Sequence, residues 1–165
     1  MDIMYTPWRY DYVSSVDERT GCIFCEKAAE DNDRENLVVW RAEKCFAILN
    51  LYPYSSGHTM VAPYKHTGTI EELDVETLGE MMAVAQRLMK AIRESFGNQG
   101  FNIGINIARI AGAGITEHVH MHVVPRWAGD ANFMPVCADT RVLPMDLDQV
   151  WMRLTEQLRS DEPAR

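Results

Sequence analysis

The chain has 165 residues, of which 47% are hydrophobic and 24% charged, and its formal net charge is −8. Such a length and composition are those of a globular protein with one domain and a sizeable core. The negative charge argues against a broad, sequence-independent grip on nucleic acid or on an acidic membrane, because both depend on clustered Lys and Arg. A small nucleotide bound by a few local donors is compatible with this charge.

We expect a cytoplasmic protein, with neither nucleic acid nor a membrane among its partners. No apolar run approaches the roughly 20 residues that span a bilayer, and the first residues lack the form of a signal peptide. In a reducing compartment the pair Cys22-x-x-Cys25 indicates metal or redox chemistry and not a disulfide. Cys45 and Cys137 lie in apolar surroundings and are expected in the core.

The N-terminal part is rich in aromatic residues and then carries the cysteine pair. Residues 1–20 hold Tyr5, Trp8, Tyr10 and Tyr12 without a sustained period. We interpret them as an arm that packs on the body or on a second subunit, and a partly disordered tail is the alternative. A short helix is expected at residues 26–30.

Three β-rich runs follow. Residues 37–41 and 45–49 are separated by three residues, which predicts an antiparallel hairpin. Residues 50–57 have a loop composition, and residues 58–62 are expected to form a strand that ends at Pro63.

The next segment predicts a long amphipathic helix that begins after an N-cap at Asp74 and is ended by Gly97 and Gly100. Apolar residues recur at steps of three and four, at Leu78, Met81, Met82, Ala85, Leu88, Met89, Ile92 and Phe96. This methionine-rich stripe favours core packing over an adaptable binding face.

Residues 101–108 alternate and predict a strand, and residues 111–114 form a Gly-rich loop. A C-terminal amphipathic helix is expected from about Pro144, with an apolar face of Leu147, Val150, Trp151, Leu154 and Leu158. About five short strands with two main helices predict an α+β domain, with an antiparallel sheet covered on one face.

Residues 116–127 place three histidines in alternation with apolar residues. In an extended chain His118, His120 and His122 share one face, while Val119 and its apolar partners enter the core on the other. Imidazole acts as nucleophile, base or metal ligand near neutral pH, so function is sought here first.

The run from His118 to Val124 resembles the signature of the histidine triad (HIT) family. The segment from Gly57 to His66 resembles the upstream Gly-His-x-apolar-Val-x-Pro-x-x-His segment of the same family, and a long helix separates the two. The resemblance covers residues 21–136, with an arm at 1–20 and a helix and tail at 137–165. It implies a five-stranded antiparallel sheet with one long helix and a C-terminal helix, doubled in a homodimer.

The chain is most similar to the diadenosine tetraphosphate phosphorylase-like branch. This finer resemblance rests on residues 50–54, on Asn106, and on residues 124–127 followed by 129–133. It implies cleavage of a phosphoanhydride in a purine nucleotide or dinucleoside polyphosphate, through a covalent nucleotidyl-histidine. The middle histidine, His120, would attack phosphorus, with His58 and His122 orienting the triad and tuning its protonation.

The resemblance also implies nucleotide-binding residues. Many hydrolase members have Gln in the loop before the triad, whereas the loop here has none, so its implied substitutes are Asn106, Trp127 and the loop N–H groups around Gly112 and Gly114. A simple Gly-containing connection is the alternative for this loop. Asn50 matches the position that binds the ribose hydroxyls, and a loop-capping Asn is the alternative.

A structural zinc site is implied as well. Zinc-bearing relatives take two cysteines and two histidines from positions that correspond here to Cys22, Cys25, His66 and His118. Two thiolates and two imidazoles make a closed tetrahedral site.

Three alternatives remain open at this stage. One is a HIT hydrolase of other conjugates, such as phosphoramidates or adenylyl sulfate, and another is a nucleotide-binding sensor without turnover. The third is a catalytic zinc shared by the three triad imidazoles. Same-face residues of a strand lie about 6.5 to 7 Å apart, a spacing that opposes this third alternative.

Overall fold

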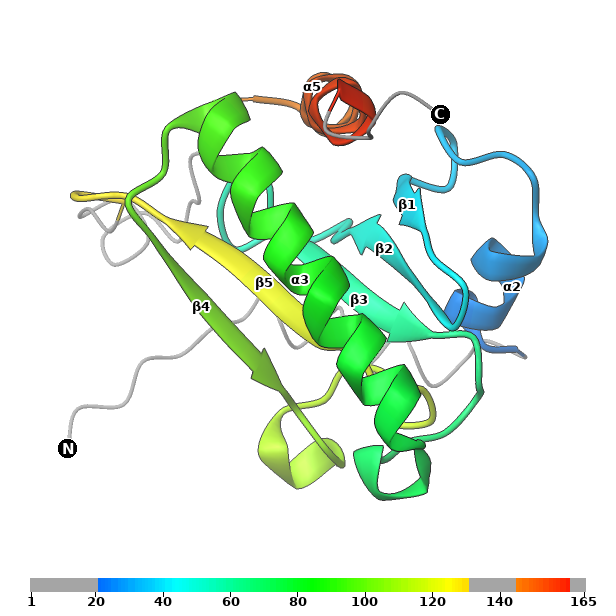
Figure 1. Ribbon diagram of the computed structural model, residues 1–165. Coiled ribbons are helices and arrows are strands. Elements are labelled where there is room, and N and C mark those ends of the chain that lie inside the picture. The colour runs from blue at the N-terminus through cyan, green and yellow to red at the C-terminus, as the bar shows by residue number, and fades with distance from the viewer. Residues whose placement is uncertain (1–20, 131–144, 161–165) are drawn as a thin grey trace, which may run out of the picture.

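The computed structural model describes residues 21–130 and 145–160 (Figure 1). The expected arm, Cys137, Pro144 and the predicted C-terminal limit of the domain at residue 136 lie outside these residues. The described elements follow in chain order as α2 (Ile23–Ala29), β1 (Val38–Arg41), β2 (Cys45–Leu49), β3 (Thr59–Pro63), the 3-10 helix η1 (Ile70–Glu72), α3 (Val75–Phe96), β4 (Gly100–Ile105), the 3-10 helix η2 (Arg109–Ala111), β5 (Met121–Arg126) and α5 (Leu147–Ser160).

The described strands form one five-stranded antiparallel sheet in the order β1-β2-β3-β5-β4. The predicted hairpin is confirmed, because Arg41 pairs with Phe46 and Val38 with Ile48 across its two strands. Gly104 and Met60 both pair with His122, so β5 lies between β4 and β3. The antiparallel α+β fold is therefore as predicted.

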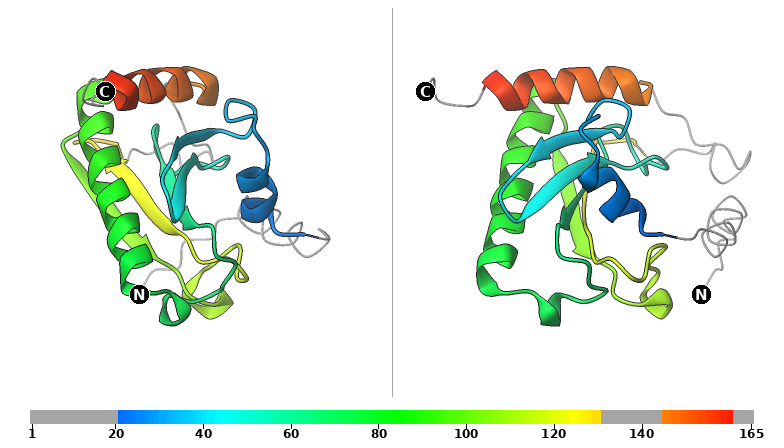
Figure 2. Two further views of the ribbon diagram at one scale, coloured as in Figure 1. Left: turned by 45° about the vertical axis from the view of Figure 1, so that its right-hand side comes forward. Right: turned by 90° about the vertical axis from the view of Figure 1, so that its right-hand side faces the viewer.

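Helix α3 packs along one face of the sheet (Figures 1 and 2). The Asp74 side chain caps its start by accepting a hydrogen bond of 2.6 Å from the Thr77 N–H, and Gly97 ends it in the left-handed region at φ 65°. Met82 is 54% exposed and so is not part of the buried stripe, which was a wrong prediction. Val84 and Ala91 are buried instead, so the buried face is turned around the helix axis relative to the apolar stripe predicted from the sequence.

The C-terminal helix α5 crosses the end of α3 and contacts β1 (Figure 1). Val150, Leu154 and Leu158 are buried, as the helical pattern predicts. The Trp151 indole donates a 2.8 Å hydrogen bond to the Val38 carbonyl, and this bond joins α5 to β1.

The other face of the sheet carries α2 and a second, smaller core. Phe24 from α2 packs there with four buried residues of the sheet, namely Val38, Phe46, Ile48 and Ala62. The helix begins at Ile23, three residues earlier than predicted, because burial of Phe24 outweighs the weak helical signal of so short a segment.

The histidine segment is only partly a strand. β5 starts at Met121, so His118 and His120 precede it, and the Val119 N–H bonds to the Thr67 carbonyl at 2.6 Å in place of a sheet neighbour. The predicted alternation holds, since Val119 is buried in the core beneath α3. The strand predicted over residues 101–108 ends at Ile105, because the chain then turns at Ala108 with φ 66°. Among the described helices, none has the length and apolar character needed to cross a membrane.

Candidate functional site

His120 lies in a buried position with one ring nitrogen already bonded. Its Nδ1 lies 2.9 Å from the His118 carbonyl, which can only accept, so Nδ1 carries the proton and donates. The ring is 4% exposed and packs 4.9 Å from the Phe24 ring. Burial lowers the pKa of His120, although the bond to His118 opposes this shift, so the ring is neutral near pH 7. The remaining nitrogen, Nε2, therefore holds a lone pair that can attack an electrophile.

His58 and His122 form a hydrogen-bonded pair beside His120. The Tyr54 N–H donates to His58 Nδ1 at 3.0 Å, so in the neutral ring the proton is on Nε2. His58 Nε2 in turn lies 2.9 Å from His122 Nδ1, to which it donates. The proton of neutral His122 is therefore on Nε2. With its ring centroid 4.9 Å from that of His120, His122 can supply a hydrogen-bond donor where His120 supplies a nucleophile.

Asn50 directly follows β2, next to this pair. Its Oδ1 accepts from the Tyr52 N–H at 2.9 Å, and its Nδ2 lies 3.4 Å from His58 Nδ1. The bond to Tyr52 is the local loop contact expected of a capping Asn, and it also fixes the orientation of the amide.

A cavity of about 440 Å³ lies between α2, the end of β2 and the loop before the triad. Its volume is within the range of small-molecule sites, which is about 300 to 1,000 Å³. The apolar part of its wall is formed by Ile23, Phe24, Leu37, Ile48, Leu49 and Met60. Asn50 and Gly114 also line it, so two of the predicted nucleotide-binding residues meet here.

The other predicted nucleotide-binding residues differ in position. Asn106 directly follows Ile105, the last residue of β4, which pairs with Met121 beside His120. Gly112 is left-handed at φ 90° and its N–H bonds to the Arg109 carbonyl at 2.9 Å, so this glycine shapes the turn.

Trp127 follows the far end of β5, where its indole donates to the Phe96 carbonyl at 3.3 Å. Seven residues of extended chain separate it from His120, a span of roughly 20 Å. The structure thus does not bring Trp127 to the cavity of its own chain.

The four predicted metal ligands converge at the N-terminal end of α2. The ligand atoms of Cys22, Cys25, His66 and His118 all lie within 4.8 Å of one another. The His118 Nδ1 lies 3.2 Å from Cys22 Sγ and 3.6 Å from Cys25 Sγ, and His66 Nδ1 lies 3.3 Å from Cys25 Sγ. Neighbouring ligands around tetrahedral zinc are about 3.3 to 3.8 Å apart, so these separations are those of a metal site.

The chemistry of these four residues also fits a cation. Burial raises the pKa of the Cys25 thiol, and Cys22 and Glu26 raise it further, an environment that a bound cation would offset. The His118 Nε2–H donates to the Pro63 carbonyl at 2.8 Å, which leaves Nδ1 as the metal-binding nitrogen. Since His118 faces the cysteines and His120 bonds to a carbonyl, the triad imidazoles do not share one metal.

Two contributors to the site were not predicted. Phe24 packs against both His118 and His120, at ring distances of 5.2 and 4.9 Å. The position of Phe24 between the two predicted metal ligands Cys22 and Cys25 could have indicated this contact. Tyr54 orients His58 through a backbone N–H, and no side-chain pattern reveals such a contact.

Known proteins are similar to this chain in sequence and in fold. Residues 32–129 match the HIT domain family. An AP-4-A phosphorylase of Mycobacterium tuberculosis is 36% identical over 98% of this chain and 84% of that protein. A bis(5'-adenosyl)-triphosphatase of Dictyostelium discoideum is 31% identical over 56% of this chain and 62% of that protein.

A solved structure agrees with the fold. A zinc-bound histidine triad family protein of Mycobacterium smegmatis superposes with a TM-score of 0.69 at 30% identity, covering 85% of this chain and 94% of that one. The chain therefore belongs to the HIT domain family.

Proposed function

We propose that this protein cleaves a phosphoanhydride of a dinucleoside polyphosphate through a covalent intermediate on His120. The observation that carries the proposal is the 2.9 Å bond from His120 Nδ1 to the His118 carbonyl, which fixes the tautomer and leaves Nε2 as the nucleophile. The curated relatives named for AP-4-A phosphorylase and bis(5'-adenosyl)-triphosphatase activity support this substrate class.

In the first step His120 Nε2 attacks the α-phosphorus of one nucleotide. A phosphorus–nitrogen bond forms, the bond to the bridging oxygen breaks, and the rest of the substrate leaves as a nucleotide. The His122 Nε2–H donates to a phosphate oxygen on which charge develops, and His58 keeps that proton in place through its 2.9 Å bond. In the second step an acceptor oxygen attacks the same phosphorus and releases His120.

We assign phosphate as the acceptor. The loop before the triad contains no Gln, and this lack together with the likeness to the phosphorylase branch favours phosphorolysis. In our proposal Asn50 binds the ribose hydroxyls, while Asn106 and the Gly114 N–H contact phosphate. Hydrolysis of adenylyl sulfate is the second candidate, because an adenylylsulfatase of Arabidopsis thaliana is 28% identical over 72% of this chain.

Product analysis with diadenosine tetraphosphate tests the assignment. With phosphate present we expect ADP and ATP, and without phosphate no turnover. AMP and ATP formed without phosphate would show a hydrolase, and no reaction with any dinucleoside polyphosphate would overturn the proposal. A His120→Asn variant should bind AMP while losing turnover and the nucleotidyl adduct.

We further propose a cytoplasmic homodimer that binds neither membranes nor nucleic acid. The thiol-rich metal group suits a reducing compartment. Strand β4 lies at one end of the sheet order and Ile103 on it is 42% exposed, which suits pairing with a second copy. Light scattering of the purified protein distinguishes a dimer from a monomer.

A further inference from the structure

The apolar wall of the cavity is interrupted by one lysine on α2. Ile23 and Lys27 are one helical turn apart, and both line the cavity together with Phe24. Lys27 is half-buried, and an ammonium group at such a position has a cost unless it is hydrogen-bonded.

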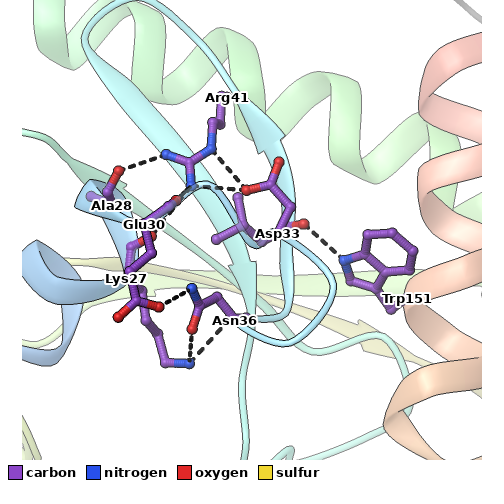
Figure 3. A network of polar contacts seen from close by, with 8 residues as sticks. Lys27, Ala28, Glu30, Asp33, Asn36, Arg41 and Trp151 are labelled. Carbon is purple, nitrogen blue, oxygen red and sulfur yellow. Dashed lines mark hydrogen bonds and ion pairs between the residues drawn. The ribbon is translucent and has the colours of Figure 1, made fainter.

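Asn36 is the partner of this lysine. Lys27 Nζ donates to the Asn36 Oδ1 and to the Asn36 carbonyl, each at 3.3 Å (Figure 3). The Asn36 Nδ2 donates to Glu30 Oε2 at 2.6 Å, and because a carboxylate only accepts, this bond fixes the orientation of the amide. Asn36 is 9% exposed and lines the same cavity, so its oxygen is an acceptor with a fixed position.

Arg41 holds this part of the wall. It donates to the carbonyls of Ala28 and Glu30, each at 2.7 Å, and to that of Lys27 at 3.3 Å (Figure 3). These bonds tie the C-terminal end of α2 to β1, so the lysine and the asparagine keep one relative position.

We propose that Lys27 and Asn36 read the edge of the nucleobase and select adenine. This inference rests on the proposed function only in taking the cavity as the nucleotide site. Adenine has an amino donor at position 6 beside a ring acceptor, N7 on one edge or N1 on the other. The amino group donates to Asn36 Oδ1, and the ring nitrogen accepts from the Lys27 ammonium. A 6-oxo purine bound in the same orientation would place its O6 next to Asn36 Oδ1, and two acceptors cannot form a hydrogen bond.

Calorimetric titration of the full-length protein with AMP and IMP tests this selection. A correct donor–acceptor pair against a mismatched one is worth about tenfold in affinity, so AMP should bind at least about tenfold more tightly than IMP. Lys27→Met should weaken AMP binding by about tenfold, since it keeps most of the apolar stem of the side chain and removes the donor. Lys27→Arg should keep most of the affinity.

Two further variants complete the experiment. Asn36→Leu should bring the two nucleotides to within about twofold of one another, because the fixed acceptor is lost. Lys90→Met, at an exposed site of α3, is the matched control and should change neither affinity. Circular dichroism identifies a variant that does not fold, and if Asn36→Leu fails, the Lys27 variants decide.

Equal affinities for AMP and IMP in the wild type would overturn the proposal, as would unchanged AMP affinity in Lys27→Met or no saturable binding of AMP. The outcome is independent of turnover. An enzyme that phosphorolyses diadenosine tetraphosphate without base selection would refute only this inference. A protein that selects AMP without turnover would refute only the proposed function.

Discussion

Replacing Arg41 by Met should destabilise the protein more than substitutions at surface positions usually do. The Arg41 side chain is 28% exposed, and its guanidinium donates to three carbonyls at the end of α2 and pairs with Asp33 at 2.8 Å. A hydrogen bond to a charged group contributes about 1.5 to 3 kcal/mol net when buried. In the variant, water can reach some of the carbonyl and carboxylate groups that Arg41 leaves unpaired. We therefore expect the unfolding free energy to fall by about 2 to 3 kcal/mol, less than the sum over all bonds.

Urea unfolding followed by circular dichroism measures this loss. With a slope of about 2 kcal/mol per molar urea, the midpoint should fall by about 1 to 1.5 M. Arg34→Met is the matched control, because Arg34 makes a bidentate pair with Asp148 but both side chains are more than half exposed. Its midpoint should not move measurably. If both variants lower the midpoint equally, or neither does, the bracing role assigned to Arg41 is refuted.

Two other predictions concern the metal site and the loop before the triad. Cys25→Ser should not retain zinc in elemental analysis and should unfold at a lower temperature. The control variant Cys45→Ala should keep its zinc. A full equivalent of zinc in Cys25→Ser would contradict the proposed metal site. Gly68→Ala should cost about 1 to 3 kcal/mol in unfolding free energy, because its Cβ would lie 2.5 Å from the Thr116 carbonyl oxygen. At Gly79 in α3 an added Cβ would have nothing within 4 Å, so Gly79→Ala should raise the unfolding free energy by about 0.5 to 1 kcal/mol. If both glycine variants changed the unfolding free energy in the same direction, the packing argument would be refuted.

Local signals in the sequence predicted the elements whose ends are fixed locally. The Asp74 cap and the Gly97 stop bounded α3 correctly, and the three-residue spacing predicted the hairpin of β1 and β2. The start of β5 was wrong because the Val119 N–H bonds to Thr67, some fifty residues away in the chain, and no local pattern reveals such a partner.

The candidate site was predictable to the extent that it rests on side chains in the recognised motifs. Cys22, Cys25, His66 and His118 come together as expected. The backbone contacts that set the tautomers, from Tyr54 to His58 and from His120 to His118, have no side-chain signature and needed the structure. Lys27 in the cavity wall was not predicted, because a charged residue on a short helix is expected to face solvent. Only the position of the neighbouring strand shows that it lines the cavity.

Helix α2 has only seven residues, a length at which an isolated helix is not stable in water. Residues from other parts of the chain contact both ends of the helix. His66 and His118 lie at its N-terminal end, and Arg41 donates hydrogen bonds at its C-terminal end. The segment can therefore acquire its shape only after β1 and the histidine segment have taken their places. We therefore expect the sheet beneath α3 to form first in folding and α2, with its wall of the cavity, to dock last. In native-state hydrogen exchange, the amides of α2 should then open before those of the sheet.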